Sequence, residues 1–244
     1  MKALLSFFTI LPVRGASLHE AAREIHLLPL VGLVTGLPGA GLLLAAHVVP
    51  PGVAATLALG AVLLAAGLHH ADGVLDVGDA LMAHGSPDRR REVLHDTRVG
   101  IGGLGALFLI YAPTVAALAA LCAVSPGRAA LALLAGEVAA RSAMLLMLAF
   151  GEPVDPRSSS VPFVRALSGS HRTPGVVVAL LAPLPFLLAA GVLLAPLAIL
   201  AVPLVAFCAL RISQATFGGI GGDVVGATGE ASRAVLLVLL SASI

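Results

Sequence analysis

Residues 175–210 read GVVVALLAPLPFLLAAGVLLAPLAILAVPLVAFCAL, an apolar run of 36 residues without a charged side chain. A helix needs about 20 mostly apolar residues to cross a bilayer, so this run is too long for one span. It predicts two membrane helices joined by a tight turn near Leu194–Pro196. The whole chain is similar in character, with 59% hydrophobic and 11% charged residues, whereas soluble domains have about 25% charged residues. The sequence therefore predicts an all-α, polytopic integral membrane protein.

Apolar runs on both sides of this stretch predict the remaining spans. The final run, Ala234 to Ile244, is too short to cross alone, so its helix is expected to begin earlier, near Val225. Together the runs predict seven membrane helices, with six as the alternative, in a single membrane-embedded domain over residues 1–244. The other expected spans are His26–Val49, Val53–Leu68, Ile101–Val124 and Ala129–Phe150.

The basic residues predict the orientation of the chain. Cytoplasmic loops of membrane proteins carry an excess of Lys and Arg. With the N-terminus in the cytoplasm, 12 of the 14 Lys and Arg residues fall on the cytoplasmic side. We therefore expect a cell-membrane protein whose long polar loops, and an active site built from them, face the cytoplasm. The residues counted on that side are Lys2, Arg14, Arg23, Arg89, Arg90, Arg91, Arg98, Arg157, Arg165, Arg172, Arg211 and Arg233.

Several classes of function are disfavoured by what the sequence lacks. A net charge of +1 and the lack of a basic patch interleaved with aromatic residues argue against nucleic-acid binding. No P-loop, GxSxG, CxxC or HExxH motif occurs, which argues against ATP hydrolysis, serine hydrolysis and zinc chemistry. The N-terminal MKALLSFFTILPVRG has no small-residue cleavage site and predicts an interfacial helix rather than a removed signal peptide.

The polar stretch 68–103, LHHADGVLDVGDALMAHGSPDRRREVLHDTRVGIGG, separates two apolar runs and holds six of the 13 carboxylates. Asp72, Asp76 and Asp79 are spaced i, i+4, i+7 and so share one stripe of a helix. Three carboxylates on one stripe repel each other unless a cation lies among them. Mg²⁺ prefers oxygen ligands, commonly one or two carboxylates together with substrate phosphate. The stretch predicts a Mg²⁺ site at the membrane edge that acts on an anionic substrate; the alternative is a solvated helix end.

The residues after this stripe predict phosphate contacts. Glu92 and Asp96 repeat the i, i+4 spacing at the start of what reads as a second helix. Arg98 then leads into Gly100 and two further glycines, where a forked cation and free backbone N–H groups at a helix N-terminus suit phosphate. The preceding run of three arginines is expected to anchor the topology instead.

Two further acidic positions lie outside the stretch. Glu137 and Arg141 sit i, i+4 inside an apolar span, where they either neutralise each other or face substrate. Asp223 lies in the glycine-rich loop FGGIGGDVVGATGE, and the expected topology puts this loop on the same side as the acidic stretch. Asp223 is therefore a candidate for contact with metal or substrate.

The motif from His69 to Gly103 closely resembles the signature of the cobalamin synthase family, the adenosylcobinamide-GDP ribazoletransferases. That signature has the form H-x-D-G-x-x-D-x-x-D, followed by an acidic residue and D-[ST]-R-x-G. Three further segments also look like those of the family: FFTILPV and HLLPLVGLVTG near the N-terminus and GGDVVGATGE near the C-terminus. The segment from Gly151 to Val164 departs from the family pattern, so no functional residue is assigned there. The matching residues are His70, Asp72, Gly73, Asp76, Asp79, Glu92, Asp96, Thr97, Arg98 and Gly100.

The resemblance implies a Mg²⁺-dependent membrane enzyme of cobalamin biosynthesis. Such an enzyme joins α-ribazole, or its 5′-phosphate, to adenosylcobinamide-GDP and releases GMP, giving adenosylcobalamin or its 5′-phosphate. His70 or an aspartate such as Asp79 would take the proton of the attacking hydroxyl group. The implied metal ligands are Asp72, Asp76, Asp79 and Asp96, and the implied substrate-binding residues are Glu92, Arg98, Gly100 and Asp223. Arg141 joins the candidates for substrate binding because of its position inside a span.

Two other readings stay open. A CDP-alcohol phosphotransferase is also a membrane enzyme with spaced aspartates, but its pattern has Ala-Arg soon after the first Asp-Gly, where this chain has Val74, Leu75 and Asp76. A divalent-cation transporter would carry its acids at mid-span, whereas most acids here cluster at one membrane edge. In each reading the partners are small molecules or ions and the lipid bilayer. The sequence leaves open whether the chain forms a homo-oligomer.

Overall fold

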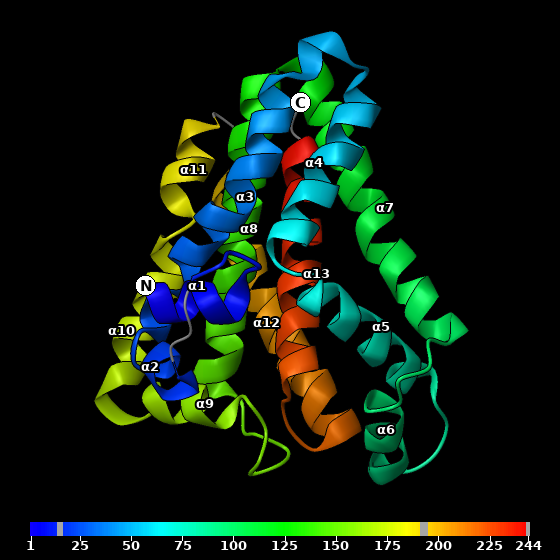
Figure 1. Cartoon of the computed structure of the whole chain (residues 1–244), viewed down its shortest axis with the longest axis vertical. Coiled ribbons are helices and arrows are strands. Elements are labelled where there is room, and N and C mark those ends of the chain that lie inside the picture. The colour runs from blue at the N-terminus through cyan, green and yellow to red at the C-terminus, as the bar shows by residue number, and fades with distance from the viewer. Residues whose placement is uncertain (14–16, 191–194, 243–244) are drawn as a thin grey trace.

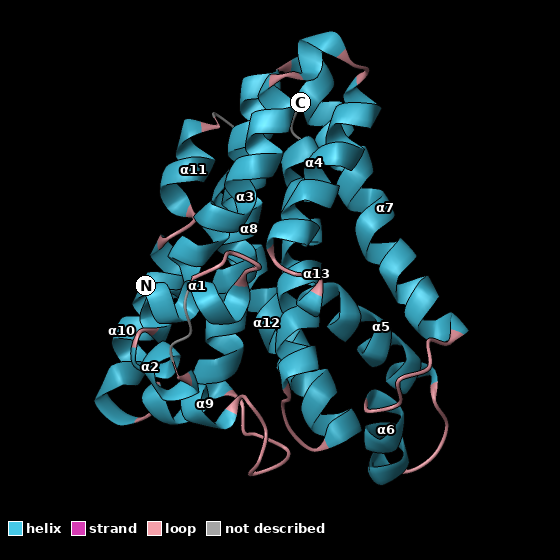
Figure 2. Cartoon of the chain, viewed as in Figure 1, coloured by secondary structure: helices cyan, strands magenta, loops and turns pink. Residues whose placement is uncertain are grey.

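The computed structural model describes residues 1–13, 17–190 and 195–242, and the regular elements in these ranges are helices, as Figure 1 and Figure 2 show. Six segments are long and apolar enough to cross a membrane, and a bent helix pair makes up to seven. The prediction of a polytopic all-α membrane protein with six to seven spans is therefore confirmed. The six segments are Ile25–Val48, Ile101–Val124, Pro126–Phe150, Gly169–Ala189, Leu197–Phe217 and Gly222–Ser241.

Most of these segments consist of one long helix, and their bounds differ from the expected ones by a few residues. The last helix, α13, begins at Gly222 and takes up most of the glycine-rich loop. The long apolar run divides into two spans, as expected. Leu194 of the predicted turn lies outside the described residues, and so does Arg14. The helices are α3 (Leu28–Leu44), α7 (Ile101–Val124), α8 (Pro126–Phe150), α10 (Arg172–Leu181), α11 (Leu184–Ala189), α12 (Ala195–Phe217) and α13 (Gly222–Ser241).

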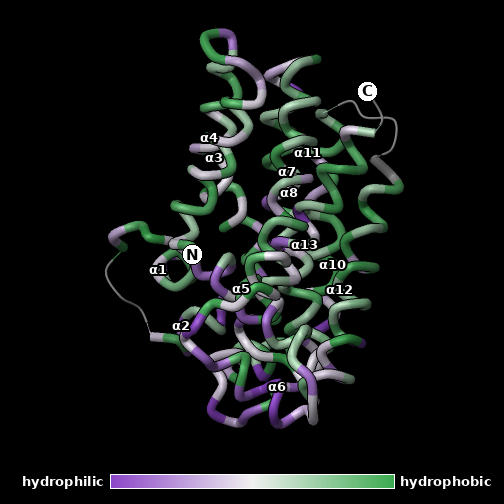
Figure 3. The backbone as a smooth tube through the Cα atoms, turned by 90° about the vertical axis from the view of Figure 1, so that its right-hand side faces the viewer, coloured by the Kyte–Doolittle hydropathy of each residue, from purple (hydrophilic) through white to green (hydrophobic). Residues whose placement is uncertain are grey.

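Polar segments gather at one end of the molecule, where Figure 3 shows the hydrophilic residues concentrated. This end carries three short helices, α2 (Leu18–Arg23), α6 (Pro87–Leu94) and α9 (Val161–Ala166), and α1 (Lys2–Phe8) lies just above them. The acidic stretch 68–103, the segment 151–164 with its three consecutive serines (the Ser-rich segment) and the Gly-rich loop thus meet at the same end. One basic residue departs from the expected distribution: Arg233, counted above as cytoplasmic, is fully buried within α13.

The centre of the bundle is α8, in which every residue from Ala135 to Ala149 is buried. Small residues allow this, because membrane helices approach closely where side chains are short. Along α3, Gly32, Gly36 and Gly39 form a stripe against α8, and a Cβ atom at Gly32 would lie 2.4 Å from the carbonyl oxygen of Glu137. The stripe therefore sets the distance between α3 and α8.

The seventh span is broken. Helix α4 (Pro51–Ala65) ends at a left-handed turn in which φ is 72° at Gly67 and 60° at Leu68. Helix α5 (His69–Met82) then leaves at 96° to α4. Two glycines let α5 lie between neighbours: a Cβ at Gly73 would be 2.7 Å from the carbonyl oxygen of Asp223 in α13, and a Cβ at Gly78 would be 2.5 Å from the Cβ of Ala106 in α7. The predicted metal-binding stripe is thus wedged between α13 and α7.

Candidate active site

The crossing of α5 and α13 brings Asp223 to the acidic stripe. Besides the backbone contact at Gly73, a Cβ at Gly226 would lie 3.0 Å from Cδ2 of His70, so the two helices touch over a full turn. The carboxylate of Asp76 is repelled by those of Asp72, Asp79 and Asp223. These four aspartates, from segments more than a hundred residues apart, form one acidic group. Asp72 is exposed, whereas the other three are half-buried.

Asp79 has a structural role within this group. Its carboxylate accepts hydrogen bonds from the backbone N–H groups of Gly100, at 2.7 Å, and Gly103, at 2.8 Å. These N–H groups begin α7, where the helix dipole favours a negative charge. The sequence predicts that phosphate would occupy this helix N-terminus, but in the structure the Asp79 carboxylate occupies it and ties α5 to α7.

The donor set of the remaining aspartates fits Mg²⁺. Within the described ranges, no three His, Cys, Asp or Glu side chains are already arranged around one point as a complete metal site. Mg²⁺ does not need such an arrangement, because one or two carboxylates, substrate phosphate and water commonly complete its octahedron. Asp72, Asp76 and Asp223 supply only oxygen atoms, and a bound cation would relieve their mutual repulsion.

A pocket of about 360 Å³ adjoins the acidic group at Asp223. The Ser-rich segment reaches it because its start is fixed to the glycine-rich loop: the N–H of Val154 donates to the carbonyl of Ile220 at 3.1 Å, and the N–H of Ile220 donates to Glu152 at 2.8 Å. The sequence predicts no site residue in this segment, because residues 151–164 depart from the family pattern. The polar character of the segment was the available signal that it lies near the site. The lining residues are Phe7, Phe8, His69, His70, Met144, Leu148, Ser159, Ser160, Phe163, Gly222, Asp223 and Val225.

His70 lies where the pocket meets the bundle core. Its Nδ1 is buried, has no hydrogen-bond partner among the described residues, and lies 3.8 Å from Oε1 of Glu230 in α13. The ring is tilted against that of Phe8, with centroids 6.4 Å apart. Because Nδ1 faces the core, Nε2 is the nitrogen atom left for contact with a ligand.

Asp96 and Arg98 form a pair of their own. The guanidinium group of Arg98 donates to both carboxylate oxygens of Asp96, the closest at 2.8 Å, and the backbone N–H of Arg98 adds a further bond. These bonds hold the pKa of Asp96 at about 2. The Arg98 side chain is 87% exposed, and no interaction between Asp96 and the acidic group is found in the part of the chain that is described. The structure therefore does not bring Asp96 to the other predicted metal ligands.

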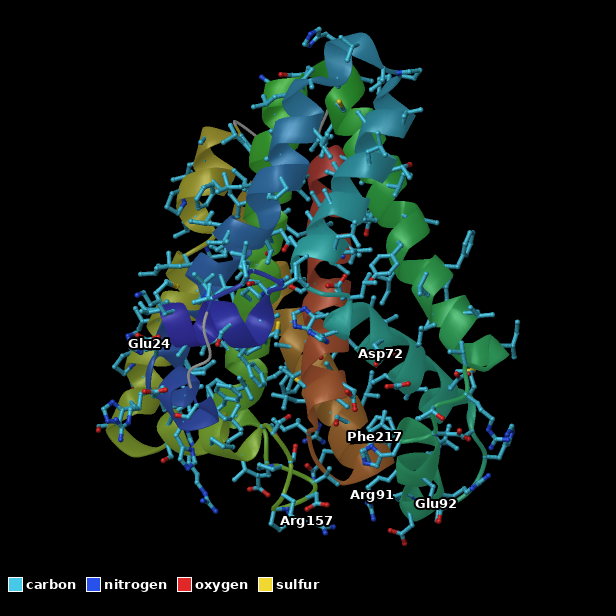
Figure 4. The ribbon with its side chains drawn as sticks, viewed as in Figure 1. Glu24, Asp72, Arg91, Glu92, Arg157 and Phe217 are labelled. Carbon is cyan, nitrogen blue, oxygen red and sulfur yellow. The ribbon has the colours of Figure 1, made fainter. Side chains whose placement is uncertain are left out.

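Glu92 also lies apart from the acidic group. It pairs with Arg89 at 2.8 Å on the surface of α6, and Figure 4 shows it at the tip of that helix, away from Asp72. It lines a separate polar groove of about 880 Å³ together with Arg91 and His95. His95, which sequence analysis did not single out, connects the two regions because it interacts electrostatically with both Asp76 and Asp223.

The last predicted site residue, Arg141, belongs to a buried network of charges. Arg141 lies 3.6 Å from Glu137 and donates to Thr35 at 3.3 Å, and the Thr35 hydroxyl donates to Glu137 at 2.8 Å. Glu137 also accepts a 2.7 Å hydrogen bond from Arg233, which pairs with Glu230 in its own helix.

Two arginines and two glutamates of this network are fully buried, or almost so, and their formal charges cancel. This favours the neutralised-pair interpretation of Arg141 over contact with substrate. Sequence analysis missed Glu230 and Arg233. Their i, i+3 spacing inside the last apolar segment was the available signal.

Comparisons with known proteins agree on one family. The cobalamin-5-phosphate synthase family matches residues 1–241. An adenosylcobinamide-GDP ribazoletransferase of Azorhizobium caulinodans is 34% identical, over 97% of this chain and 92% of its own length. Proteins of the same name from Methanosarcina barkeri (31% identity, 98% and 90% covered) and Pyrobaculum calidifontis (34%, 98% and 97%) are similar over nearly their whole lengths. No solved structure matches.

Replacing Asp79 with alanine should destabilise the contact between α5 and α7. The substitution removes the partner of two N–H groups at the start of α7, a loss comparable to that of a helix cap, about 0.5–2 kcal/mol. Thermal unfolding of the detergent-solubilised protein measures the effect. Asp88→Ala is the matched control, because Asp88 is exposed and its partner among the described residues is Arg91, one turn along the same helix. Equal unfolding temperatures for the two variants would show that the cap contributes nothing.

Replacing Glu137 with glutamine should destabilise the bundle far more. It leaves two buried arginines facing one glutamate, and breaking a buried pair costs about 3–5 kcal/mol. Glu92→Gln makes the same chemical change at an exposed pair and should cost at most about 1 kcal/mol. The double variant Glu137→Gln/Arg141→Gln restores neutrality and should recover much of the loss. A double variant no more stable than Glu137→Gln alone would contradict the charge argument.

Proposed function

Because the chain belongs to the cobalamin-5-phosphate synthase family, we propose that it transfers the cobinamide-phosphate group of adenosylcobinamide-GDP to α-ribazole or its 5′-phosphate. The reaction releases GMP and completes the nucleotide loop of the cobalamin. The family match over the whole chain carries this proposal. The placement of the acidic group beside a pocket supports it, because such a transfer needs phosphate and acceptor side by side.

In this reaction a hydroxyl oxygen of the ribazole ribose forms a bond to the phosphorus atom nearest the cobinamide, and the bond from that phosphorus to the GMP oxygen breaks. We propose that Asp72, Asp76 and Asp223 hold Mg²⁺, since they are the oxygen donors that the α5–α13 crossing brings together. An ion held by these residues would supply positive charge beside the phosphates. We propose that His70, which lines the pocket, accepts the hydroxyl proton.

Arg98 has a conditional role. A planar guanidinium group suits the donor's phosphates, but in the structure its hydrogen-bonding edge is occupied by Asp96. Arg98 therefore contacts phosphate only when it leaves Asp96. The exposure of the Arg98 side chain allows this exchange.

The two alternative functions are not favoured. The family that matches the chain is not that of the CDP-alcohol phosphotransferases. A transporter would need acids free to bind ions along its path, whereas the two glutamates inside the bundle, Glu137 and Glu230, are each paired with Arg233.

We propose that the protein lies in the cell membrane with its polar end, and so the acidic group, in the cytoplasm. The support is the excess of basic residues at that end, which the positive-inside rule assigns to the cytoplasm. Because Arg233 is buried in the bundle, it no longer counts as a loop residue, and 11 of the 14 Lys and Arg residues remain in the predicted cytoplasmic set. The excess of basic residues on that side is therefore retained.

The proposed activity can be tested with purified protein, adenosylcobinamide-GDP, α-ribazole and Mg²⁺, with GMP as the product measured. Asp76→Asn should abolish GMP release without lowering the unfolding temperature, because its carboxylate makes no protein hydrogen bond among those found. EDTA should stop the wild-type reaction, and added Mg²⁺ should restore it. Turnover by Asp76→Asn at ordinary Mg²⁺ concentrations would remove that residue from the metal site, and no GMP from the wild-type protein would overturn the function.

Orientation can be tested by labelling single cysteines in intact cells, in a Cys208→Ser background because Cys208 is exposed. Ser86→Cys, at the polar end, should react only with membrane-permeant maleimide. Gly52→Cys, at the exposed start of α4 at the opposite end, should also react with an impermeant one. The reverse pattern would show that the acidic group faces away from the cytoplasm.

A further inference from the structure

The pocket beside the acidic group has two chemically different walls. One wall is apolar, formed by Phe7 and Phe8 of α1, Phe163 of α9 and two residues of α8. The other is polar, formed by the N-terminal ends of α5 and α13 and the Ser-rich segment. None of the described residues that line it is Lys or Arg. The pocket lining therefore offers a diphosphate no cationic side chain, and the charge of such a group would have to be met by a metal ion at the acidic group outside the pocket.

The apolar wall is an aromatic cluster drawn from distant parts of the sequence. The ring centroids of Phe7 and Phe8 lie 4.9 Å apart, and Phe163 lies 5.4 Å from Phe7 and 5.8 Å from Phe8. Phe8 and Phe163 are buried, but Phe7 is 41% exposed. Such a cluster presents ring faces and edges on which a planar heteroaromatic base can stack.

Size separates the two substrates. Pockets for small ligands range from about 300 to 1,000 Å³, and this one, at about 360 Å³, is near the lower limit. A nucleoside with a fused two-ring base suits that volume. The corrinoid donor, which has a macrocycle and a nucleoside diphosphate, does not fit within it.

The polar wall gives the direction of binding. Asp223 belongs both to the pocket and to the acidic group, because its backbone touches α5 at Gly73. A base stacked against the exposed side of the phenylalanine cluster would leave its ribose at the Asp223 and His70 wall. The ribose hydroxyl would then lie next to the carboxylates that hold the donor phosphate through metal.

We propose that this aromatic pocket is the subsite for the base of the ribazole acceptor, and that the donor binds outside it, across the acidic group. The assignment rests on the proposed function. It gives α1 and α9, which carry none of the predicted catalytic residues, the task of choosing and orienting the acceptor.

The test replaces pocket phenylalanines with leucine, which keeps an apolar side chain and removes the ring. Phe7→Leu and Phe163→Leu should raise the Kd of α-ribazole, measured by calorimetry on protein in lipid nanodiscs, about ten- to hundredfold, the usual worth of one stacked base. The KM for α-ribazole should rise in parallel, whereas the KM for adenosylcobinamide-GDP should stay unchanged. Phe108→Leu is the matched control, because Phe108 is a 68% exposed residue of α7 outside the pocket.

A higher KM for adenosylcobinamide-GDP with unchanged ribazole binding would assign the pocket to the donor and overturn the proposal. Unchanged constants for both substrates in Phe7→Leu would overturn it too, and this partly exposed position keeps the test valid if Phe163→Leu does not fold. Failure of the underlying function is a separate result, since the wild-type protein would then release no GMP.

Discussion

The structure depends on the buried ion pair between Glu137 of α8 and Arg233 of α13. Neither side chain is exposed, and the apolar surroundings offer no water to replace a lost partner. The pair fixes the rotation and height of α13 against the central helix, and Thr35 adds α3 to the same contact. Because Glu230, one turn earlier in α13, lies beside His70, the position of α5 is tied to it as well. Helix α13 is thus held in place by charges buried inside the bundle.

The second constraint is the absence of side chains at a few glycines. Gly73 and Gly226 let α5 and α13 cross at backbone contact, and Gly78 lets α5 press against α7 on its other side. A Cβ at Gly73 or Gly78 would lie within 3.0 Å of a neighbouring helix, so α5 could not keep its present position against α13 and α7. The proximity of Asp223 to the stripe is therefore a result of packing, and the acidic residues themselves, which repel each other, would not assemble without it.

The sequence predicts well what depends on composition and periodicity. Apolar run lengths identify the spans, and i, i+4, i+7 spacing puts Asp72, Asp76 and Asp79 on one stripe. The sequence is a poor predictor of contacts between side chains on different helices, because these depend on which helices pack together. The partner of Glu137 is found 96 residues away in Arg233, and nothing in the spacing of either residue indicates the other. Likewise, the glycines at the start of α7 predict backbone N–H groups that are free to bind phosphate. In the structure, the bend after α4 directs α5 so that the Asp79 carboxylate accepts hydrogen bonds from two of these N–H groups. The pocket joins residues 7, 163 and 223, whose proximity no local pattern contains.

That bend at Gly67 and Leu68 sets the depth of the chemistry in the bilayer. Helix α4 has 15 residues and so a length of about 22 Å at 1.5 Å per residue, less than the hydrocarbon core of about 30 Å. Since α5 begins where α4 stops, near mid-height in Figure 1, His70 and Asp72 lie deeper than the end of a full span would place them. Charges at this level are surrounded by a medium of lower dielectric constant than bulk solution, where attraction between unlike charges is stronger. An anionic substrate that binds at this level would therefore meet the carboxylates below the polar end of the molecule, where lipid and helices leave less water to compete for their charges.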